Sequence, residues 1–439
     1  MAQEIIRRSI SKTEKKYVFL NRKFIIIKLN YEFFIANRLN ASKEHKSSVS
    51  SPIIKIAIVA IALGIVVMMI SIATSVGLQE KIREKVSGFN GHIQLTNFDN
   101  NSSEITLIPV SKEQDFYPEF NSVEGVKKVQ VFATKAGIIR TKTDFEGVVV
   151  KGVGSDYDWS FFKDYLVEGN LPVYSEKRSL DILLSRHIVD RLQFKIGDEF
   201  NTIFLKDDPN IPPSIRVFKL VGIYNSGFKD FDESIMIADI KQIQKLNRWE
   251  ENQVGGFEIF LDDFEKIEEK SRLIYTQTPS DMNTEAIVHK FPGIFEWIKL
   301  FDNNTLLIII IMVLVAGINM TTALLVLILE RTQMIGILKA MGSTNWSIRK
   351  IFLYNASYLI LRGLFWGNLI GISILLIQYY FGVIALNPET YYVKEVPVYF
   401  SIRHILLLNI GTLTLCLLML LIPSWIITKI SPVNAIKFE

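Results

Sequence analysis

The side chains that most often perform chemistry are few in this sequence, and their spacing matches no metal-binding or catalytic pattern. The one cysteine, Cys416, lies inside an apolar run, and no serine nucleophile motif is visible. The histidines are far apart and form no H-E-x-x-H pattern: His45, His92, His187, His289 and His404. Zinc sites need several His or Cys ligands at short, regular spacing. We therefore expect no catalytic residue and no metal.

Nucleotide chemistry is not expected either. No G-x-x-x-x-G-K-[ST] stretch occurs, so the chain lacks the loop that cradles nucleotide phosphates. Adjacent acids such as Asp207 and Asp208, or Asp262 and Asp263, are typical of solvated loops rather than of catalytic pairs. We expect a chain that is not an enzyme and binds no cofactor, with any ATP being used by a partner subunit.

The composition indicates a membrane protein. Hydrophobic residues make up 49% of the 439 positions, and the mean hydropathy is +0.25, which is too apolar for an ordinary soluble protein of this size. The net charge of +4 gives no indication of a nucleic-acid partner. With one cysteine, a domain in an oxidising compartment cannot be held by intrachain disulfides.

Four uncharged runs are long enough to cross about 30 Å of hydrocarbon as helices. They cover residues 56–78, 305–329, 363–388 and 405–428, and the third helix is expected to begin earlier, near residue 351. Basic residues set the expected orientation: residues 1–55 hold twelve Lys or Arg against four Glu, and residues 330–350 hold four against one. Both segments are therefore expected in the cytoplasm, together with both termini.

These signals predict a membrane protein with four transmembrane α-helices and a large mixed α+β domain outside the cytoplasm between helices 1 and 2. The expected order is a cytoplasmic N-terminal region (1–51) with an interfacial helix near 31–40, a first span (52–78), an outer domain with helical stalks at both ends (79–302), a second span (303–329), a short cytoplasmic helix (330–345), a third span (346–385), an outer loop (386–402), a fourth span (403–428) and a cytoplasmic C-terminus (429–439). The outer domain is large enough to hold its own core.

The segment after the second span carries the most informative pattern. Apolar residues recur at i, i+3, i+4 and i+7 after a charged start, and Gly342 is a natural stop. The residues concerned are Glu330, Arg331, Met334, Ile337, Leu338, Met341 and Gly342. Such a helix is suited to lie in a groove of a partner protein. The alternative is an amphipathic helix on the lipid interface.

Here the sequence resembles a known family, the FtsX-like or MacB-like ABC transporter permeases, and within them the lipoprotein-releasing LolC/LolE group. The resemblance rests on residues 335–342 (IGILKAMG), with agreement at 33–39 (FFIANRL), 391–398 (YYVKEVPV) and 423–439 (PSWIITKISPVNAIKFE). It covers residues 31–439, with its pieces in the family's order around the family's topology.

The resemblance implies a machine with several partners in the bacterial inner membrane. These are a cytoplasmic ABC ATPase dimer, a second permease subunit that is the same or a homologous chain, a lipoprotein substrate, membrane lipid and a periplasmic lipoprotein carrier. Residues 330–342 would be the coupling helix that receives the ATPase stroke. In this group one subunit captures the carrier with a β-hairpin, and the matching place here carries Pro209, Pro212, Pro213 and Arg216. This segment is shorter than the family pattern, so a plain proline-rich surface turn is the alternative.

The spans offer no charged polar tunnel, so we expect a lipid-anchored cargo, for which apolar walls suffice. The cargo would enter laterally between the first and second spans of opposing subunits. The expected acyl-chain contacts are Met68, Met69, Ile72, Val76, Ile310, Val313 and Leu314. Lipid-facing or helix-packing roles are the alternative for each residue. A relay that activates cell-wall hydrolases and a MacB-like mechanical efflux permease are the rival functions.

Overall fold

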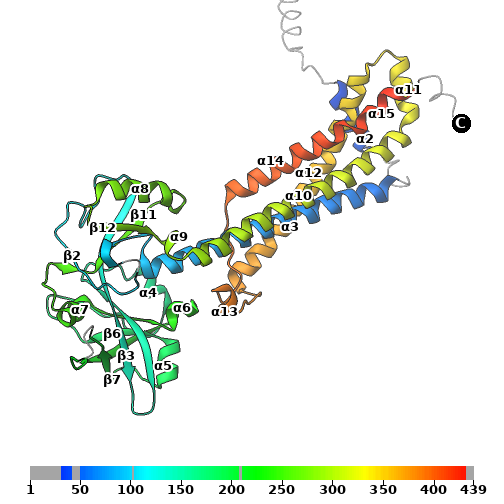
Figure 1. Ribbon diagram of the computed structural model, residues 1–439. Helices are drawn as coiled ribbons and strands as arrows, with labels where there is room; N and C mark the ends of the chain where they lie inside the picture. Colours follow the sequence, from blue (N-terminus) through cyan, green and yellow to red (C-terminus); the bar gives the residue numbers. More distant parts are fainter. Residues whose placement is uncertain (1–30, 42–49, 101–102, 207–209, 432–439) are drawn as a thin grey trace, which may run out of the picture. The chain divides into compact units, whose positions relative to one another are not determined.

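The computed structural model describes residues 31–41, 50–100, 103–206 and 210–431, and it divides into two units (Figure 1). The helical unit takes its described residues from Met1–Ala73, Asn304–Leu376 and Phe400–Glu439. The mixed unit comprises Thr74–Asn303 and Ile377–Tyr399.

Long apolar helices dominate the helical unit. They are α3 (Ser50–Asn90), α10 (Pro292–Glu330), α12 (Asn345–Phe381) and α14 (Ile402–Leu421). Within the described residues, four helices are long and apolar enough to cross a membrane, which confirms the predicted multi-pass class. The shorter elements of this unit are α2 (Tyr31–Ala41), α11 (Thr332–Ala340), η4 (Pro423–Trp425) and α15 (Ile426–Lys429).

Glycines let two of the spans approach closely. A Cβ on Gly363 of α12 would lie 2.7 Å from Ile61 Cγ2 of α3, and one on Gly367 would lie 2.8 Å from Ile65 Cβ. Any side chain at these two positions would force the helices apart, so the spacing of four residues gives α12 a smooth packing face.

A polar pair joins α12 to α14. Asn368 Nδ2 donates to Asn409 Oδ1 (2.6 Å), and Asn409 Nδ2 donates back to Asn368 Oδ1 (3.0 Å). Each amide satisfies the other, which is how polar side chains are tolerated between apolar helices. The sequence analysis did not identify this pair.

The mixed unit is built on a ten-stranded sheet with the order β12-β1-β11-β3-β4-β9-β6-β8-β5. The strands of this order are β1 (Ile93–Asn97), β3 (Val126–Arg140), β4 (Phe145–Val153), β5 (Leu166–Gly169), β6 (Asp181–Ser185), β8 (Ser214–Tyr224), β9 (Ile235–Asp239), β11 (Gly256–Leu261) and β12 (Met282–Ala286). The tenth strand, β7 (Glu199–Phe204), pairs with both β3 and β8. The pairings β3–β4–β9–β6–β8–β7 therefore close into a ring. A separate small sheet pairs β2 (Val110–Ser111) with β10 (Gln253–Val254).

Helices and parallel strand pairs make this unit a mixed α+β fold, as predicted. Strand β4 runs parallel to β9 and β6 runs parallel to β8, whereas the other pairs are antiparallel. The remaining elements are η2 (Phe98–Asn100), α4 (Ser160–Tyr165), α5 (Arg186–Leu192), α6 (Lys229–Asp232), α7 (Ile240–Asn247), η3 (Phe264–Lys266), α8 (Ile267–Gln277), α9 (Ile287–Lys290) and α13 (Pro388–Tyr391).

The last four turns of α3 belong to the core of the mixed unit. Leu78, Ile82, Val86 and Phe89 recur on one face and are all buried in that core. The helix ends at Asn90 because Gly91 adopts a left-handed conformation (φ +67°) and its N–H bonds to the Ser87 carbonyl oxygen. The first turns of α10 contribute Phe295 and Ile298 to the same core.

The segment that follows α12 also packs inside the mixed unit. The helix ends at Phe381 because Gly382 takes a positive φ (+54°), with its N–H bonded to the Gln378 carbonyl oxygen. Further on, the Tyr392 ring stacks on Phe228 with 4.4 Å between centroids. The loop between the third and fourth apolar helices is thus part of the mixed unit's structure.

Candidate functional site

Helix α11 is a short helix with a well-formed stop. The N–H of Ser343 bonds to the Leu338 carbonyl oxygen (3.0 Å) across Gly342, whose φ is +91°. This geometry is the Schellman motif that glycine favours after a helix. Thr344 then caps α12, with Thr344 Oγ1 accepting the Ser347 N–H (3.2 Å). Both features follow from the sequence at residues 342–344.

The predicted apolar stripe of α11 divides between two environments. Ile337 and Met341 are 47% and 75% exposed. Leu338 is 8% exposed and packs inside the helical unit, as does Ile335, whereas Met334 is half-buried. Glu330 is exposed and Arg331 is half-buried. Within this chain, Ile337 and Met341 are the apolar side chains of the stripe that a partner could cover.

A lysine anchors α11 to the end of the chain's last helices. Lys339 Nζ donates to the carbonyl oxygens of Ile427 (2.7 Å) and Ile430 (2.8 Å), at the C-terminal end of α15. These carbonyls lie where a helix leaves its acceptors unsatisfied, so an ammonium group there caps the helix and complements its dipole. The sequence analysis did not identify Lys339, because it lies on α11 but outside the apolar stripe.

Two further contacts fix the segment that follows α11. Arg349 on α12 donates to the Leu421 carbonyl oxygen (2.9 Å) and to Ser424 Oγ (3.1 Å). Glu32 of α2 accepts the hydroxyl of Ser347 (2.9 Å). Hydrogen bonds from its own backbone N–H and from Ser347 lower the pKa of Glu32. These contacts tie the first turns of α12, which directly follow α11, to α2 and to the end of α14.

The predicted acyl-chain residues are also divided by burial. Met68, Met69 and Val313 are buried within the helical unit, Ile72 and Val76 are half-buried, and Ile310 and Leu314 are about half exposed. Met69 fills the space beside Gly371, whose added Cβ would lie 3.0 Å from the Met69 sulfur. Ile310 and Leu314 are one helical turn apart on α10 and present an outward apolar face.

The described part of the predicted carrier-binding segment lies at the end of the β7–β8 hairpin. Strands β7 and β8 pair in register from Glu199 opposite Lys219 to Phe204 opposite Ser214. Pro212 and Pro213 are exposed and Arg216 is half-buried on β8, whereas Pro209 lies outside the described residues. Apolar side chains are exposed around the tip, namely Leu205, Ile211, Ile215 and Val217.

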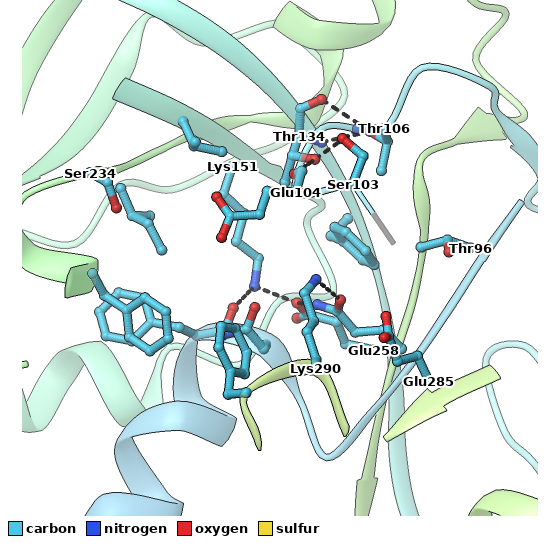
Figure 2. A pocket seen from close by; sticks show the side chains of 18 of the residues that line it. Thr96, Ser103, Glu104, Thr106, Thr134, Lys151, Ser234, Glu258, Glu285 and Lys290 are labelled. Atoms are coloured by element: carbon cyan, nitrogen blue, oxygen red, sulfur yellow. Dashed lines mark hydrogen bonds and ion pairs between the residues drawn. The ribbon is translucent and has the colours of Figure 1, made fainter. Parts of the chain in front are cut away.

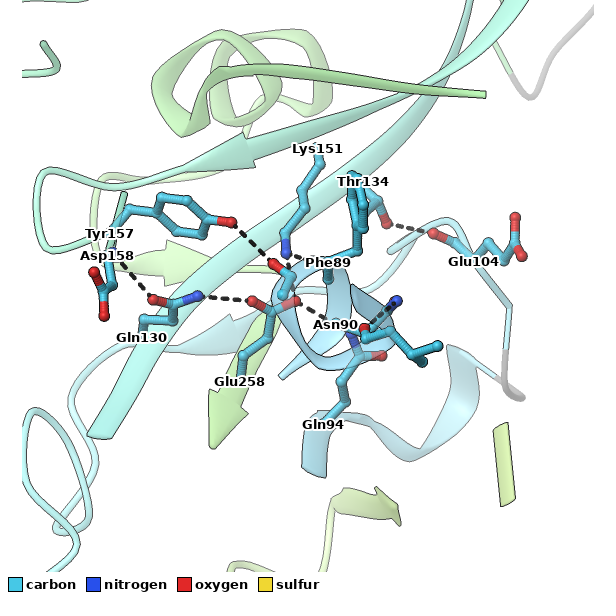
Figure 3. A network of polar contacts seen from close by, with 12 residues as sticks. Phe89, Asn90, Gln94, Glu104, Gln130, Thr134, Lys151, Tyr157, Asp158 and Glu258 are labelled. Atoms are coloured by element: carbon cyan, nitrogen blue, oxygen red, sulfur yellow. Dashed lines mark hydrogen bonds and ion pairs between the residues drawn. The ribbon is translucent and has the colours of Figure 1, made fainter. Parts of the chain in front are cut away.

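A buried ion pair holds the end of α3 against the sheet, and sequence analysis did not identify it. Lys151 Nζ of β4 donates to the Phe89 carbonyl oxygen (2.5 Å) and to Glu258 Oε1 of β11 (2.6 Å) (Figure 3). Glu258 also accepts from Gln130 (3.0 Å) and Gln94 (3.3 Å). Burial lowers the pKa of Lys151, an effect that the neighbouring carboxylate opposes. The sequence gives one indication of this pair: Lys151 and Glu258 are each a single charge within an apolar stretch of a strand.

A cavity of about 270 Å³ adjoins this network, and Figure 2 shows the side chains that line it. Lys290 of α9 lies at its edge and donates to Gln94 Oε1 (2.6 Å), which links it to Glu258. Burial lowers the pKa of Lys290 as well. Among the residues that the structure describes, no three His, Cys, Asp or Glu side chains come together so as to hold a metal ion.

Four membrane-spanning helices with a folded α+β unit between the first and second define a multi-pass membrane protein with a large extramembrane domain. Two family descriptions match this architecture: the MacB-like periplasmic core domain over residues 56–291 and the FtsX-like permease C-terminal region over residues 306–432. The chain belongs to the FtsX-like ABC transporter permeases with a MacB-like periplasmic core domain. It is accordingly a transmembrane subunit without a catalytic domain, and it binds no cofactor of its own.

Distant relatives match along nearly the whole chain. The chain is 24% identical over 408 residues to the lipoprotein-releasing system transmembrane protein LolC of Buchnera aphidicola, covering 88% of this chain and 94% of the relative. It is 20% identical over 422 residues to LolE of Haemophilus influenzae, covering 93% and 100%. Among solved structures, the extracellular domain of the ABC-type transporter YknZ covers 44% of this chain and 98% of that domain, with 14% identity and a TM-score of 0.30.

Proposed function

We propose that this permease couples ATP hydrolysis by a separate cytoplasmic ATPase dimer to the release of lipoproteins from the bacterial inner membrane. The observation that carries the proposal is the length of the match. LolC and LolE relatives, named as lipoprotein-releasing proteins, align over 94% and 100% of their own length, including the mixed unit as well as the spans. A second permease subunit, identical or homologous, completes the transporter.

The proposal includes a topology. Residues 1–51, 330–345 and 429–439 lie in the cytoplasm, and residues 79–302 and 386–402 lie in the periplasm, with spans at 52–78, 303–329, 346–385 and 403–428. The excess of basic residues in 1–55 and 330–350 supports this orientation.

Helix α11 is the proposed contact with the ATPase. Ile337 and Met341 are exposed on a helix whose other face is braced by Leu338 and Lys339. A helix that is held in place on its inner face can pass the movement of a bound partner on to the spans. A coupling element requires this rigidity. Glu330 and Arg331 precede this helix and add polar contacts at its start.

The proposed path of the cargo is lateral, along the outward face of α10. Ile310 and Leu314 are exposed there, and acyl chains need only apolar walls. Three of the expected contacts are buried inside the helical unit and so do not face the cargo in the isolated chain: Met68, Met69 and Val313. The hairpin tip with Pro212 and Pro213 is the proposed place for a periplasmic carrier, supported by its exposed apolar side chains.

Depletion of the chain in its host tests the function. Triacylated lipoproteins should remain in the inner membrane, as measured by fractionation, and wild-type chain supplied in trans should restore sorting. Ile310→Arg should fail to restore it while assembling normally, because the charge occupies the apolar wall. Ile410→Arg on α14, also exposed and five residues into its apolar run, is the matched control and should restore sorting.

Normal lipoprotein sorting after depletion would contradict the proposal. Altered septal wall cleavage would then favour the relay function, and altered drug resistance would favour mechanical efflux.

A further inference from the structure

A second cavity, of about 300 Å³, lies within the mixed unit between the stalk of α3 and the loop that follows α12. Its volume is at the lower end of the range of small-molecule sites. Its lining comes from Lys81 and Lys85 on α3, Tyr165 at the end of α4, Asn225 and Ser226 after β8, Gln378 and Tyr379 at the end of α12, and residues 393–398 of the following loop.

The cavity concentrates positive charge. Three lysines line it (Lys81, Lys85 and Lys394) against one carboxylate, that of Glu395. Outside the lining, Lys81 Nζ pairs with Glu84 Oε2 on the same helix (2.6 Å). Lys81 and Lys85 are four residues apart and so share a face of α3. The side chain of Lys394 lies close to that of Lys85, since both approach Gly227. A Cβ on Gly227 would lie 3.4 Å from Lys85 Nζ and 3.8 Å from Lys394 Cε.

The central lysine is buried with no carboxylate of the described residues in contact, and the charge of Asp232 acts on it from farther away. Lys85 is 4% exposed, and its Nζ donates to the Tyr392 carbonyl oxygen (2.6 Å). Over the described residues, no carboxylate oxygen lies within 4.0 Å of the ammonium of Lys85 or of Lys394. Lys85 also lies 5.5 Å from the centroid of the Tyr165 ring. A buried ammonium that faces two more lysines is costly unless an anion joins them.

Three of the lining segments lie next to apolar runs. Lys81 comes three residues after the run 56–78, Gln378 and Tyr379 end the apolar helix α12, and residues 396–398 precede α14, which begins at Ile402. A few residues of helix beyond a hydrocarbon span correspond to the depth of the lipid headgroups.

We propose that this cavity, the stalk pocket, binds the phosphate group of a membrane phospholipid through Lys81, Lys85 and Lys394. Lysine ammonium groups bind phosphate as point charges, and an ammonium has three N–H donors, of which Tyr392 takes one on Lys85. Asn225 adds a neutral amide to the wall. The bound lipid would tie the stalk of α3 to the loop 377–399. The proposal stands independently of what the permease transports.

The cavity beside Lys151 shows why charge alone does not define such a site. There, the ammonium of Lys151 is paired with Glu258, and that of Lys290 is bonded to Gln94. The network satisfies its own charges, whereas Lys85 and Lys394 line the stalk pocket with no carboxylate of the described chain in contact with their ammonium groups.

Binding of short-chain phosphatidylglycerol to the purified full-length chain in neutral detergent, followed by native mass spectrometry, tests the proposal. The wild type should retain one lipid molecule more than Lys81→Gln or Lys394→Gln, and each of these variants should bind about tenfold more weakly. Both lysines have accessible side chains, so these variants should fold normally. Lys245→Gln, which removes an exposed lysine of α7, is the matched control and should bind like the wild type.

Two additional ligands distinguish the source of the phosphate. Dioctanoylglycerol, which has the acyl chains but no phosphate, should not compete with the lipid. Inorganic phosphate at the same concentration should not compete either, because it lacks the chains that hold a lipid at this depth. Equal retention by the wild type and all three variants would overturn the site. Effective competition by inorganic phosphate would overturn its assignment to a lipid.

Discussion

Ile337 and Leu338 are neighbours in the sequence with opposite surroundings. The first is about half exposed, and the second is buried inside the helical unit. Sequence periodicity placed both on one apolar stripe, but a helix packed against its own chain uses part of such a stripe for folding. The division matters for experiments, because a variant at Leu338 changes stability, whereas one at Ile337 changes only the surface.

The double variant Ile337→Asp/Met341→Asp should abolish copurification with the ATPase while leaving the amount of chain in the membrane unchanged. Burying two unpaired carboxylates under the ATPase costs roughly several kcal/mol, whereas in the free chain the carboxylates remain in water. Ile337→Val/Met341→Leu keeps the surface apolar and is the control that should retain the ATPase. Unchanged copurification of the aspartate variant would exclude α11 as the docking surface.

His92 is a half-buried histidine whose ring accepts a hydrogen bond. The Leu261 N–H donates to His92 Nδ1 (2.8 Å), and the ring packs edge-on against Phe264. Burial, with a smaller contribution from Lys127, lowers the pKa of His92 from 6.5 to about 4. Protonation would remove the acceptor, so the folded state keeps this ring neutral.

Stability of the mixed unit should therefore fall as the pH decreases from about 6.5 to about 4. In that window the unfolded chain binds a proton at His92 and the folded chain does not, which lowers the unfolding free energy by up to about 3 kcal/mol. His92→Asn keeps an acceptor near the Nδ1 position without titrating. Thermal unfolding of the detergent-solubilised chain should show a weaker pH dependence for this variant, and identical pH profiles would refute the account.

At the scale of elements, the Lys151–Glu258 pair holds the end of α3 against the sheet. The ammonium bonds to a carbonyl of the last helical turn and to a carboxylate on β11, so one side chain joins helix to sheet. A second link comes from the apolar face that ends with Phe89.

Lys151→Met should lower the unfolding free energy of the chain by about 3 to 5 kcal/mol, because it leaves Glu258 buried and unpaired. Adding Glu258→Gln should recover part of the loss. Lys128→Met, which breaks a more exposed pair with Asp158 (3.6 Å), is the control and should cost less than about 1 kcal/mol. A similar cost for the two lysine variants, measured by chemical denaturation, would contradict a special role for the buried pair.

Elements with strong local signals could be predicted from the sequence, and those that depend on distant partners could not. The four apolar helices and the stop at Gly342 follow from composition and from glycine's conformational freedom. The Asn368–Asn409 pair and the anchors of Lys339 depend on residues 41 and about 90 positions away. A periodic sequence pattern cannot predict such contacts, because each of these residues is a single polar residue in an apolar run.

At the scale of the whole molecule, class and family follow from the order of spans and from residues 335–342, and the family match agrees. The ring of strands closed by β7 does not follow from the sequence. Period-2 patterns identify strands without revealing which strands pair, and β7 pairs with strands on both sides of it in the chain.

The proposed topology predicts which positions meet the outside of the cell. A cysteine at Ser175 in the mixed unit should react with a membrane-impermeant thiol reagent in intact cells, whereas cysteines at Ser47 and Thr344 should react only after the membrane is opened. The native Cys416 is buried, and replacing it with serine removes any background. Labelling at Thr344 in intact cells would contradict the cytoplasmic position of α11.

The most direct test of the account is lipoprotein release from proteoliposomes that contain this chain, its second permease subunit and the partner ATPase. The account predicts that a triacylated lipoprotein leaves the bilayer for a soluble acceptor only when ATP is hydrolysed. Release should be lost with Ile337→Asp/Met341→Asp in this chain, although the proteins still insert. Equal release without ATP hydrolysis, or ATP hydrolysis by a fully assembled complex without any release, would contradict it.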